Sequence, residues 1–114
     1  MGLKFRSCKA TYVPDAEMPL DESLSEGEFT WGPFLEDGKV LLYKPPYEGA
    51  RVWSAPVTTD PEKADKAGER GTYWLWDGDE RNPTLHPSLG LGEEGKGYNL
   101  WHGFLTAGHW VACE

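Results

Sequence analysis

The residue types best suited to chemistry gather in the segment 74–88, which reads WLWDGDERNPTLHPS. Two prolines bracket a histidine there, and each proline fixes its own φ and pushes the preceding residue toward extended geometry. If the stretch is extended, Thr84, His86 and Ser88 share one face while Leu85 points toward the core. We therefore predict either a rigid frame that presents polar side chains to a ligand or partner, or an ordered edge strand in which His86 caps a turn.

Three histidines are the candidate ligands for a soft metal ion: His86, His102 and His109. His102 and His109 fall on opposite arms of a predicted hairpin, so they could converge across it. However, the sequence contains no C-x-x-C or H-E-x-x-H spacing, which zinc sites usually show. The turn at 77–80 gathers three carboxylates but lacks the longer ligand set of a calcium loop. We therefore predict no metal and no cofactor, and keep a small metal-dependent enzyme using the three histidines as an alternative.

Nucleophilic catalysis by a serine is a second chemistry to weigh. Ser88 lies near a histidine in the sequence, but a catalytic serine needs a base and an orienting group, and no nucleophile-elbow pattern surrounds it. The glycine-rich stretch 90–97 also lacks the Lys-Ser/Thr that follows in a phosphate-binding loop. Since no catalytic signature is present, the sequence favours a non-catalytic protein.

Aromatic residues are numerous for so short a chain, with six Trp, five Tyr and four Phe. Most should form the core, because each buries about 150–250 Å². Trp74 and Trp76 are two residues apart on a predicted strand and should share one face. We predict that two or three tryptophans join the neighbouring polar groups in a binding surface. Its predicted members are Trp74, Trp76, Asp77, Thr84, His86, Ser88, Trp101 and His102.

The net charge of −8 is unevenly placed. The window 10–38 holds eight acidic residues and no Lys or Arg, whereas the rest of the chain is balanced. Without a basic footprint, direct nucleic-acid binding and docking on an anionic membrane are both disfavoured. An acidic stripe is either a solvated loop or a surface that attracts basic partners by imitating a phosphate backbone. The predicted acidic partner surface comprises Asp15, Glu17, Asp21, Glu22, Glu26 and Glu28.

The length of 114 residues predicts a single domain over residues 1–114. Cys8 and Cys113 lie near opposite ends and could meet if the terminal strands are neighbours, but one pair does not make a disulfide framework. No apolar run of about 18 residues and no signal-like segment follows Met1. We therefore expect a cytoplasmic protein with reduced thiols.

Short strands separated by turn signals dominate the chain. Strands are expected over 3–13, 28–35, 39–43, 51–54, 72–76, 98–106 and 109–113, and Asp37-Gly38 is a strong hairpin signal. One short helix is expected over 61–67, because Asp60 is a favourable N-cap and Pro61 suits the first position. The predicted fold class is mainly β (β-rich α+β): a small antiparallel sandwich or partly closed barrel with one short helix. Pairing of exposed edges would also favour a homodimer.

Two of these predicted hairpins share a similar sequence pattern. At an offset of 70, Trp31-x-x-Phe34 matches Trp101-x-x-Phe104, and a glycine follows each pair at the same distance. Residues three apart in a strand face opposite sides, so one aromatic of each pair should be in the core and the other exposed.

The C-terminal part of the chain, about residues 72–113, resembles a family of small uncharacterised proteins from bacteriophages and bacteria, sometimes mislabelled ammonia monooxygenase. The resemblance rests on W-x-W-[D/N]-G, P-T-x-x-P-S-[L/I] and [C/W]-H-x-F-[L/I]-x-x-G. The matching positions are Trp74, Trp76, Asp77, Gly78, Pro83, Thr84, Pro87, Ser88, His102, Phe104 and Gly108. The resemblance implies a phage or mobile-element context. Many members carry a cysteine beside the histidine and a C-x-x-C; this chain has Trp101 there and no C-x-x-C, which argues against an inherited metal site.

Three functions follow from these observations. The favoured one is a non-catalytic binding module, a phage or mobile-element accessory protein that engages a host protein or small ligand through an aromatic face. The first alternative is an acidic nucleic-acid mimic that inhibits a basic host protein. The second alternative is the small metal-dependent enzyme.

Overall fold

The fold is described from a computed structural model of the whole chain. The description covers residues 7–32, 39–47, 49–64, 73–91 and 101–112. Cys113 lies outside these ranges, as does Phe34 of the shared hairpin pattern. Whether Cys8 and Cys113 meet therefore lies outside the described residues.

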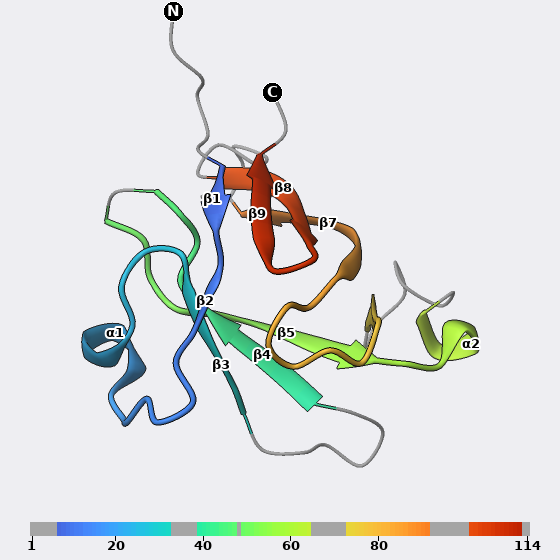
Figure 1. Cartoon of the computed structure of the whole chain (residues 1–114), viewed down its shortest axis with the longest axis horizontal. Helices are drawn as coiled ribbons and strands as arrows, with labels where there is room; N and C mark the ends of the chain where they lie inside the picture. The colour runs from blue at the N-terminus through green and yellow to red at the C-terminus, as the bar shows by residue number, and fades with distance from the viewer. Residues whose placement is uncertain (1–6, 33–38, 48, 65–72, 92–100, 113–114) are drawn as a thin grey trace, which may run out of the picture.

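Nine strands and two short helices make up the described part of the chain (Figure 1). In order they are β1 (Cys8–Lys9), β2 (Thr11–Tyr12), α1 (Leu20–Ser23), β3 (Glu28–Trp31), β4 (Lys39–Tyr43), β5 (Trp53–Thr58), α2 (Pro61–Ala64), β6 (Trp74–Trp76), β7 (Leu85–Leu91), β8 (Trp101–Thr106) and β9 (His109–Ala112).

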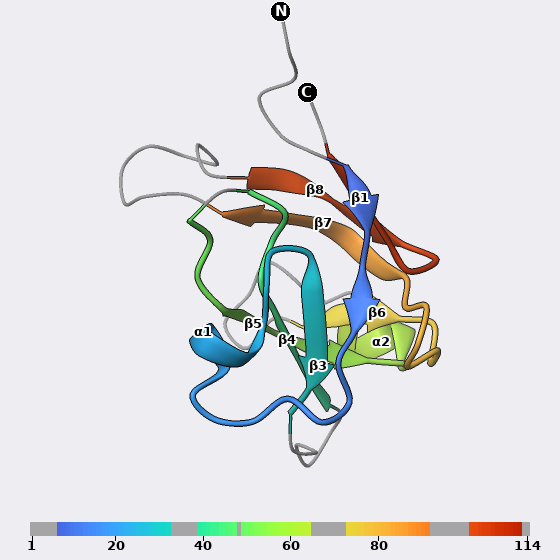
Figure 2. The same ribbon diagram turned by 60° about the vertical axis from the view of Figure 1, so that its left-hand side comes forward.

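All nine strands belong to one sheet with the order β1-β9-β8-β7-β6-β5-β4-β3-β2. The two ends of this order, β1 and β2, are consecutive pieces of a single extended segment. Its first half pairs with β9 (Cys8 with Trp110) and its second half pairs with β3 (Thr11 with Glu28). Figures 1 and 2 show this segment running from the β8–β9 hairpin down to β3. The sheet therefore curls into a nearly closed barrel, which confirms the β-rich fold class and selects the barrel over the sandwich.

Two of the strand pairings are parallel, although an antiparallel sheet was expected. β2 runs parallel to β3, and β5 runs parallel to β6. The connection between β5 and β6 contains α2, because parallel neighbours cannot be joined by a tight turn.

The core is built from alternating positions of the strands, as period-two patterning predicts. β4 reads buried, intermediate, buried along its length, and β8 alternates buried Trp101, Gly103 and Leu105 with more exposed partners. Trp101 and Trp110 are both fully buried, and their rings meet edge to face at 5.6 Å. The Trp110 Nε1 donates to the Gly27 carbonyl at 2.9 Å, so its one polar group is satisfied inside the barrel.

Several boundaries differ from the expected ones. β4 has the predicted bounds, but β5 extends to Thr58 where the prediction stopped at residue 54. The short helix α1 lies in a region predicted to be an acidic loop, because one turn of helix leaves no periodic pattern to detect. β7 continues through Pro87 to Leu91 in the interior of the sheet, although proline usually marks an edge. Among the described residues, no helix is long and apolar enough to cross a membrane.

Candidate functional site

The most irregular strand pairing of the barrel lies between β7 and β8. Leu85 pairs with Leu105 and Leu89 pairs with Gly103, so the three β7 residues 86–88 face only one residue of β8. Pro87 falls in this bulge, where its lack of an N–H removes no regular ladder bond. Bulges turn side chains away from the regular alternation and are frequent beside active sites. This bulge determines where Ser88 points.

The Ser88 hydroxyl meets the His102 imidazole across the two strands. Ser88 Oγ lies 2.9 Å from His102 Nε2, and the pair is partly buried. His102 pairs with Gly90 in the ladder, and because glycine has no side chain, that position puts no cover over the imidazole. A serine hydroxyl at hydrogen-bond distance from a histidine nitrogen is the arrangement of an activated nucleophile and its general base.

Contacts with the neighbouring strands hold Ser88 and His102 in position. Trp74 on β6 donates its Nε1 hydrogen to the Ser88 carbonyl at 3.3 Å, which ties the bulge to the neighbouring strand. Gly103, next to His102, has no room for a side chain. A Cβ there would lie 2.5 Å from the Val111 carbonyl oxygen and 2.7 Å from the Trp101 ring. β8 and β9 therefore approach closely beside His102.

The acidic turn before β7 is an exposed loop whose carboxylates bind its own backbone. Asp77 Oδ1 accepts from the N–H groups of Asp79 and Thr84, and Asp79 Oδ1 accepts from those of Arg81 and Asn82. These bonds use carboxylate oxygens that a cation would need. The turn is therefore a self-supporting frame, and Asp77 is part of that frame.

Other contacts fix the same turn to the barrel. Trp76 and Trp31 donate their indole hydrogens to the carbonyls of Asp79 and Glu80, at 3.0 and 2.9 Å. Lys39 forms an ion pair with the Glu80 carboxylate. The Thr84 hydroxyl accepts from the Ala107 N–H at 2.8 Å, which joins the start of β7 to the β8–β9 turn.

The predicted binding residues therefore separate into groups. Ser88 and His102 come together, while Trp74 and Trp76 are half-buried and use their indole hydrogens within the molecule. Trp101 is fully buried, so its indole cannot contribute to a binding surface as predicted. The exposed aromatic on β8 is Phe104, at 37 % exposure, so the predicted division of one core and one exposed aromatic is correct for this pair.

The three histidines do not converge as the metal alternative requires. His86 is exposed on β7, and His109 lies at the start of β9 with Nδ1 3.1 Å from the Ala107 carbonyl oxygen. Within the described ranges, no group of three His, Cys, Asp or Glu residues could hold a metal ion.

Two members of the predicted acidic surface have structural partners. Asp21 accepts from the Val52 N–H at 2.8 Å, and its carbonyl accepts from Lys44 Nζ at 2.7 Å. Glu28 accepts from the Ser25 N–H at 2.7 Å. The remaining four, Asp15, Glu17, Glu22 and Glu26, are exposed.

The pairing of Ser88 with His102 was not foreseen from the sequence. The two residues are 14 positions apart on neighbouring strands, so no local motif contains both. A regular ladder continued from Leu85 and Leu105 would place Ser88 directly opposite His102, whereas the bulge brings Gly90 opposite His102 and leaves Ser88 as its diagonal neighbour. The proline before Ser88 was the available signal of this irregular pairing.

Comparison with known proteins gives one family. Residues 54–113 match the family described as "Bacterial ubiquitination-like system serine protease (BubE)". The match spans more than half of the 114 residues, and the chain belongs to this family. It includes β6 to β9 and both members of the Ser88–His102 pair. No curated protein and no solved structure matches the chain significantly.

Proposed function

We propose that this protein is a serine hydrolase that cleaves an amide bond of a protein substrate, with Ser88 as nucleophile and His102 as general base. The observation that carries the proposal is the 2.9 Å contact between Ser88 Oγ and His102 Nε2. Membership of a family described as serine proteases supports it independently. Because that description names a ubiquitination-like system, the proposed substrate is a protein of such a system.

The proposed reaction follows from the protonation of the pair. With the proton of neutral His102 on Nδ1, Nε2 accepts the Ser88 hydrogen bond. Ser88 Oγ attacks the scissile carbonyl carbon while Nε2 takes its proton, and the imidazolium then protonates the leaving amine as the C–N bond breaks. A water, deprotonated by Nε2, attacks the acyl-enzyme ester. The acid product leaves and Ser88 regains its proton.

A fluorophosphonate tests this proposal without knowledge of the substrate, because it forms a covalent bond with activated serines. Intact-mass measurement should show one adduct per chain, and peptide mapping should assign it to Ser88. Ser88→Ala should show no adduct. Ser54→Ala, which removes an exposed hydroxyl from β5, is the control and should label like the parent protein. An adduct on another serine, or none in the parent protein, would refute the assignment.

A non-catalytic binding role, which the sequence favours, is the second candidate. Phe104 and Val111 are 37 % and 44 % exposed and pair directly across β8 and β9. They share the outer face of the hairpin with His102 and make an apolar patch suited to a partner protein such as a host factor. Under this function, Phe104→Ala should weaken partner capture, whereas Ser88→Ala should leave it unchanged.

A further inference from the structure

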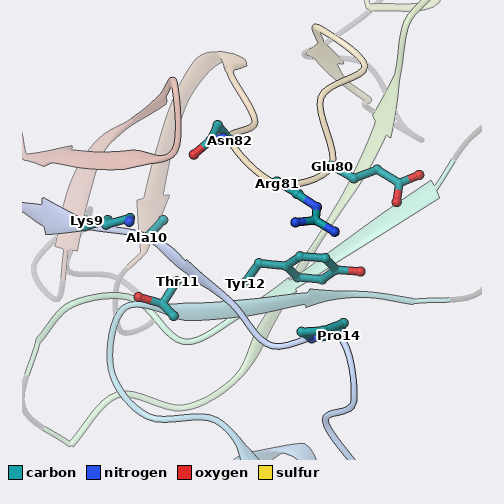
Figure 3. A pocket seen from close by; sticks show the side chains of 8 residues that line it. All are labelled: Lys9, Ala10, Thr11, Tyr12, Pro14, Glu80, Arg81 and Asn82. Carbon is teal, nitrogen blue, oxygen red and sulfur yellow. The ribbon is translucent and has the colours of Figure 1, made fainter.

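A second site lies apart from the Ser88–His102 pair, between the segment that closes the barrel and the acidic turn. It is a pocket of about 550 Å³ (Figure 3). Neither Ser88 nor His102 lines it. The polar side chains around it are those of Lys9, Thr11, Tyr12, Glu80, Arg81 and Asn82. Its volume is in the range of pockets that bind small ligands or single peptide side chains.

The pocket is locally cationic in a chain whose net charge is −8. Lys9 and Arg81 supply two positive charges, and within the described ranges neither forms an ion pair. The one acidic residue of the lining, Glu80, is paired with Lys39. Its negative charge is therefore largely balanced, and the two cations are left to attract an anion.

Hydrogen bonds hold the backbone around Arg81 in place. Its own N–H and that of Asn82 donate to Asp79 Oδ1, both at 2.9 Å, and the Glu80 carbonyl before it accepts from Trp31 at 2.9 Å. Figure 3 shows the Arg81 side chain extending from the turn toward the Tyr12 ring. A binding group on a backbone that is already ordered loses less conformational entropy when a ligand arrives.

We propose that this pocket binds a glutamate or aspartate side chain of an acidic peptide segment. The planar guanidinium of Arg81 matches the two oxygens of a carboxylate, and Lys9 adds a second point of charge. The Thr11 hydroxyl and the Asn82 amide provide neutral hydrogen-bonding groups in the lining.

The charge distribution favours a peptide over a nucleic acid. Two cations can balance one or two negative charges, whereas a nucleic acid carries one at every phosphate along its length. The window 10–38 carries eight acids and no Lys or Arg, and this excess of negative charge disfavours such a polymer. A peptide with one or two carboxylates places no further charge against that surface.

The register of the sheet gives the position of the pocket relative to Ser88 and His102. Its meaning for a substrate rests on the proposed function. Lys9 pairs with His109, which pairs with Thr106 on β8. Thr106 lies four residues along β8 from His102, about 13 Å of strand, and Lys9 lies two strands across from Thr106, about 10 Å to the side. An extended substrate bound by Ser88 would place an acidic residue roughly five positions from its scissile bond at this pocket.

The test uses the full chain carrying Ser88→Ala, so that binding is separated from cleavage. Fluorescence anisotropy would measure the affinity of a labelled acetylated diglutamate amide. Arg81→Gln should weaken this affinity at least tenfold, because it removes a charge-assisted pair. Arg51→Gln removes the same charge from an exposed position outside this pocket and is the matched control. It should bind within twofold of the parent.

Competitors identify the kind of anion. A diglutamine peptide should not displace the probe, and inorganic phosphate should displace it only at much higher concentration than unlabelled diglutamate. Equal affinity of the Arg81→Gln and parent proteins would overturn the site. Displacement by a short oligothymidylate at lower concentration than diglutamate would overturn the acidic-peptide assignment in favour of nucleic acid. Since catalysis plays no part, failure here leaves the role of Ser88 untouched.

Discussion

The acidic turn at 77–82 and the bulge at 86–88 are neighbours in sequence, yet they use their polar side chains in opposite ways. In the turn, Asp77 and Asp79 accept hydrogen bonds from nearby backbone N–H groups. In the bulge, the Ser88 hydroxyl reaches a histidine on another strand. Aspartates in tight turns readily bind their own backbone, so a cluster of carboxylates is often structural. A serine whose hydroxyl reaches a histidine on another strand is the stronger indication of a catalytic site.

Replacement of Gly103 by alanine should give the largest loss of stability. The added Cβ would lie 2.5 Å from the Val111 carbonyl oxygen and 2.7 Å from the Trp101 ring, so β8 and β9 must separate beside His102. We expect the free energy of unfolding to fall by about 1–3 kcal/mol, measured by urea denaturation. Gly32→Ala is the control, because its closest contact is the flexible Leu42 side chain at 3.2 Å. If both variants lose the same stability, close packing beside His102 is not the cause.

Asp79→Ala should have an intermediate effect, confined to the turn. It removes the acceptor of the Arg81 and Asn82 N–H groups, and in this exposed loop the loss should be about 1–2 kcal/mol. Asp79→Asn, which keeps an acceptor oxygen, should recover part of it. Fluorophosphonate labelling of Ser88 should proceed at the parental rate in both variants. A large fall in labelling would mean that the turn and the bulge act as one unit.

Trp74→Phe should have the smallest effect on stability. Unlike the Asp79 variants, it should change the rate of Ser88 labelling. It removes the 3.3 Å hydrogen bond to the Ser88 carbonyl, at a cost of about 0.5–1 kcal/mol, and should slow labelling of Ser88. Trp76→Phe is the matched variant, since it removes a similar bond to the Asp79 carbonyl in the turn. It should leave labelling unchanged. Equal labelling rates in the two variants would remove the proposed role of Trp74 in positioning the bulge.

The sequence predicts much of the barrel because its strands alternate clearly. β4 has the predicted bounds, and Leu85 is buried as expected. The segment that closes the barrel could not be predicted in this way. Its pairing with both β9 and β3 depends on sheet curvature, which residue patterns do not encode.

The candidate site was harder to predict than the fold. The sequence points to Ser88 and His102, but it groups them with Trp101 in one aromatic face. The alternation of β8 correctly separates Trp101 from Phe104, but which of the two faces the core depends on how the sheet curls. The contact of Ser88 with His102 depends on the register of β7 against β8, and the bulge sets that register.

The central claim is that Ser88 is a nucleophile whose base is His102. The most direct test is the second-order rate constant of Ser88 labelling by a fluorophosphonate, measured for the parent protein and His102→Gln under the same conditions. In His102→Gln, the rate should fall by about 10²–10⁴-fold, because a glutamine amide cannot take the Ser88 proton. Equal rates in the two proteins would contradict the claim.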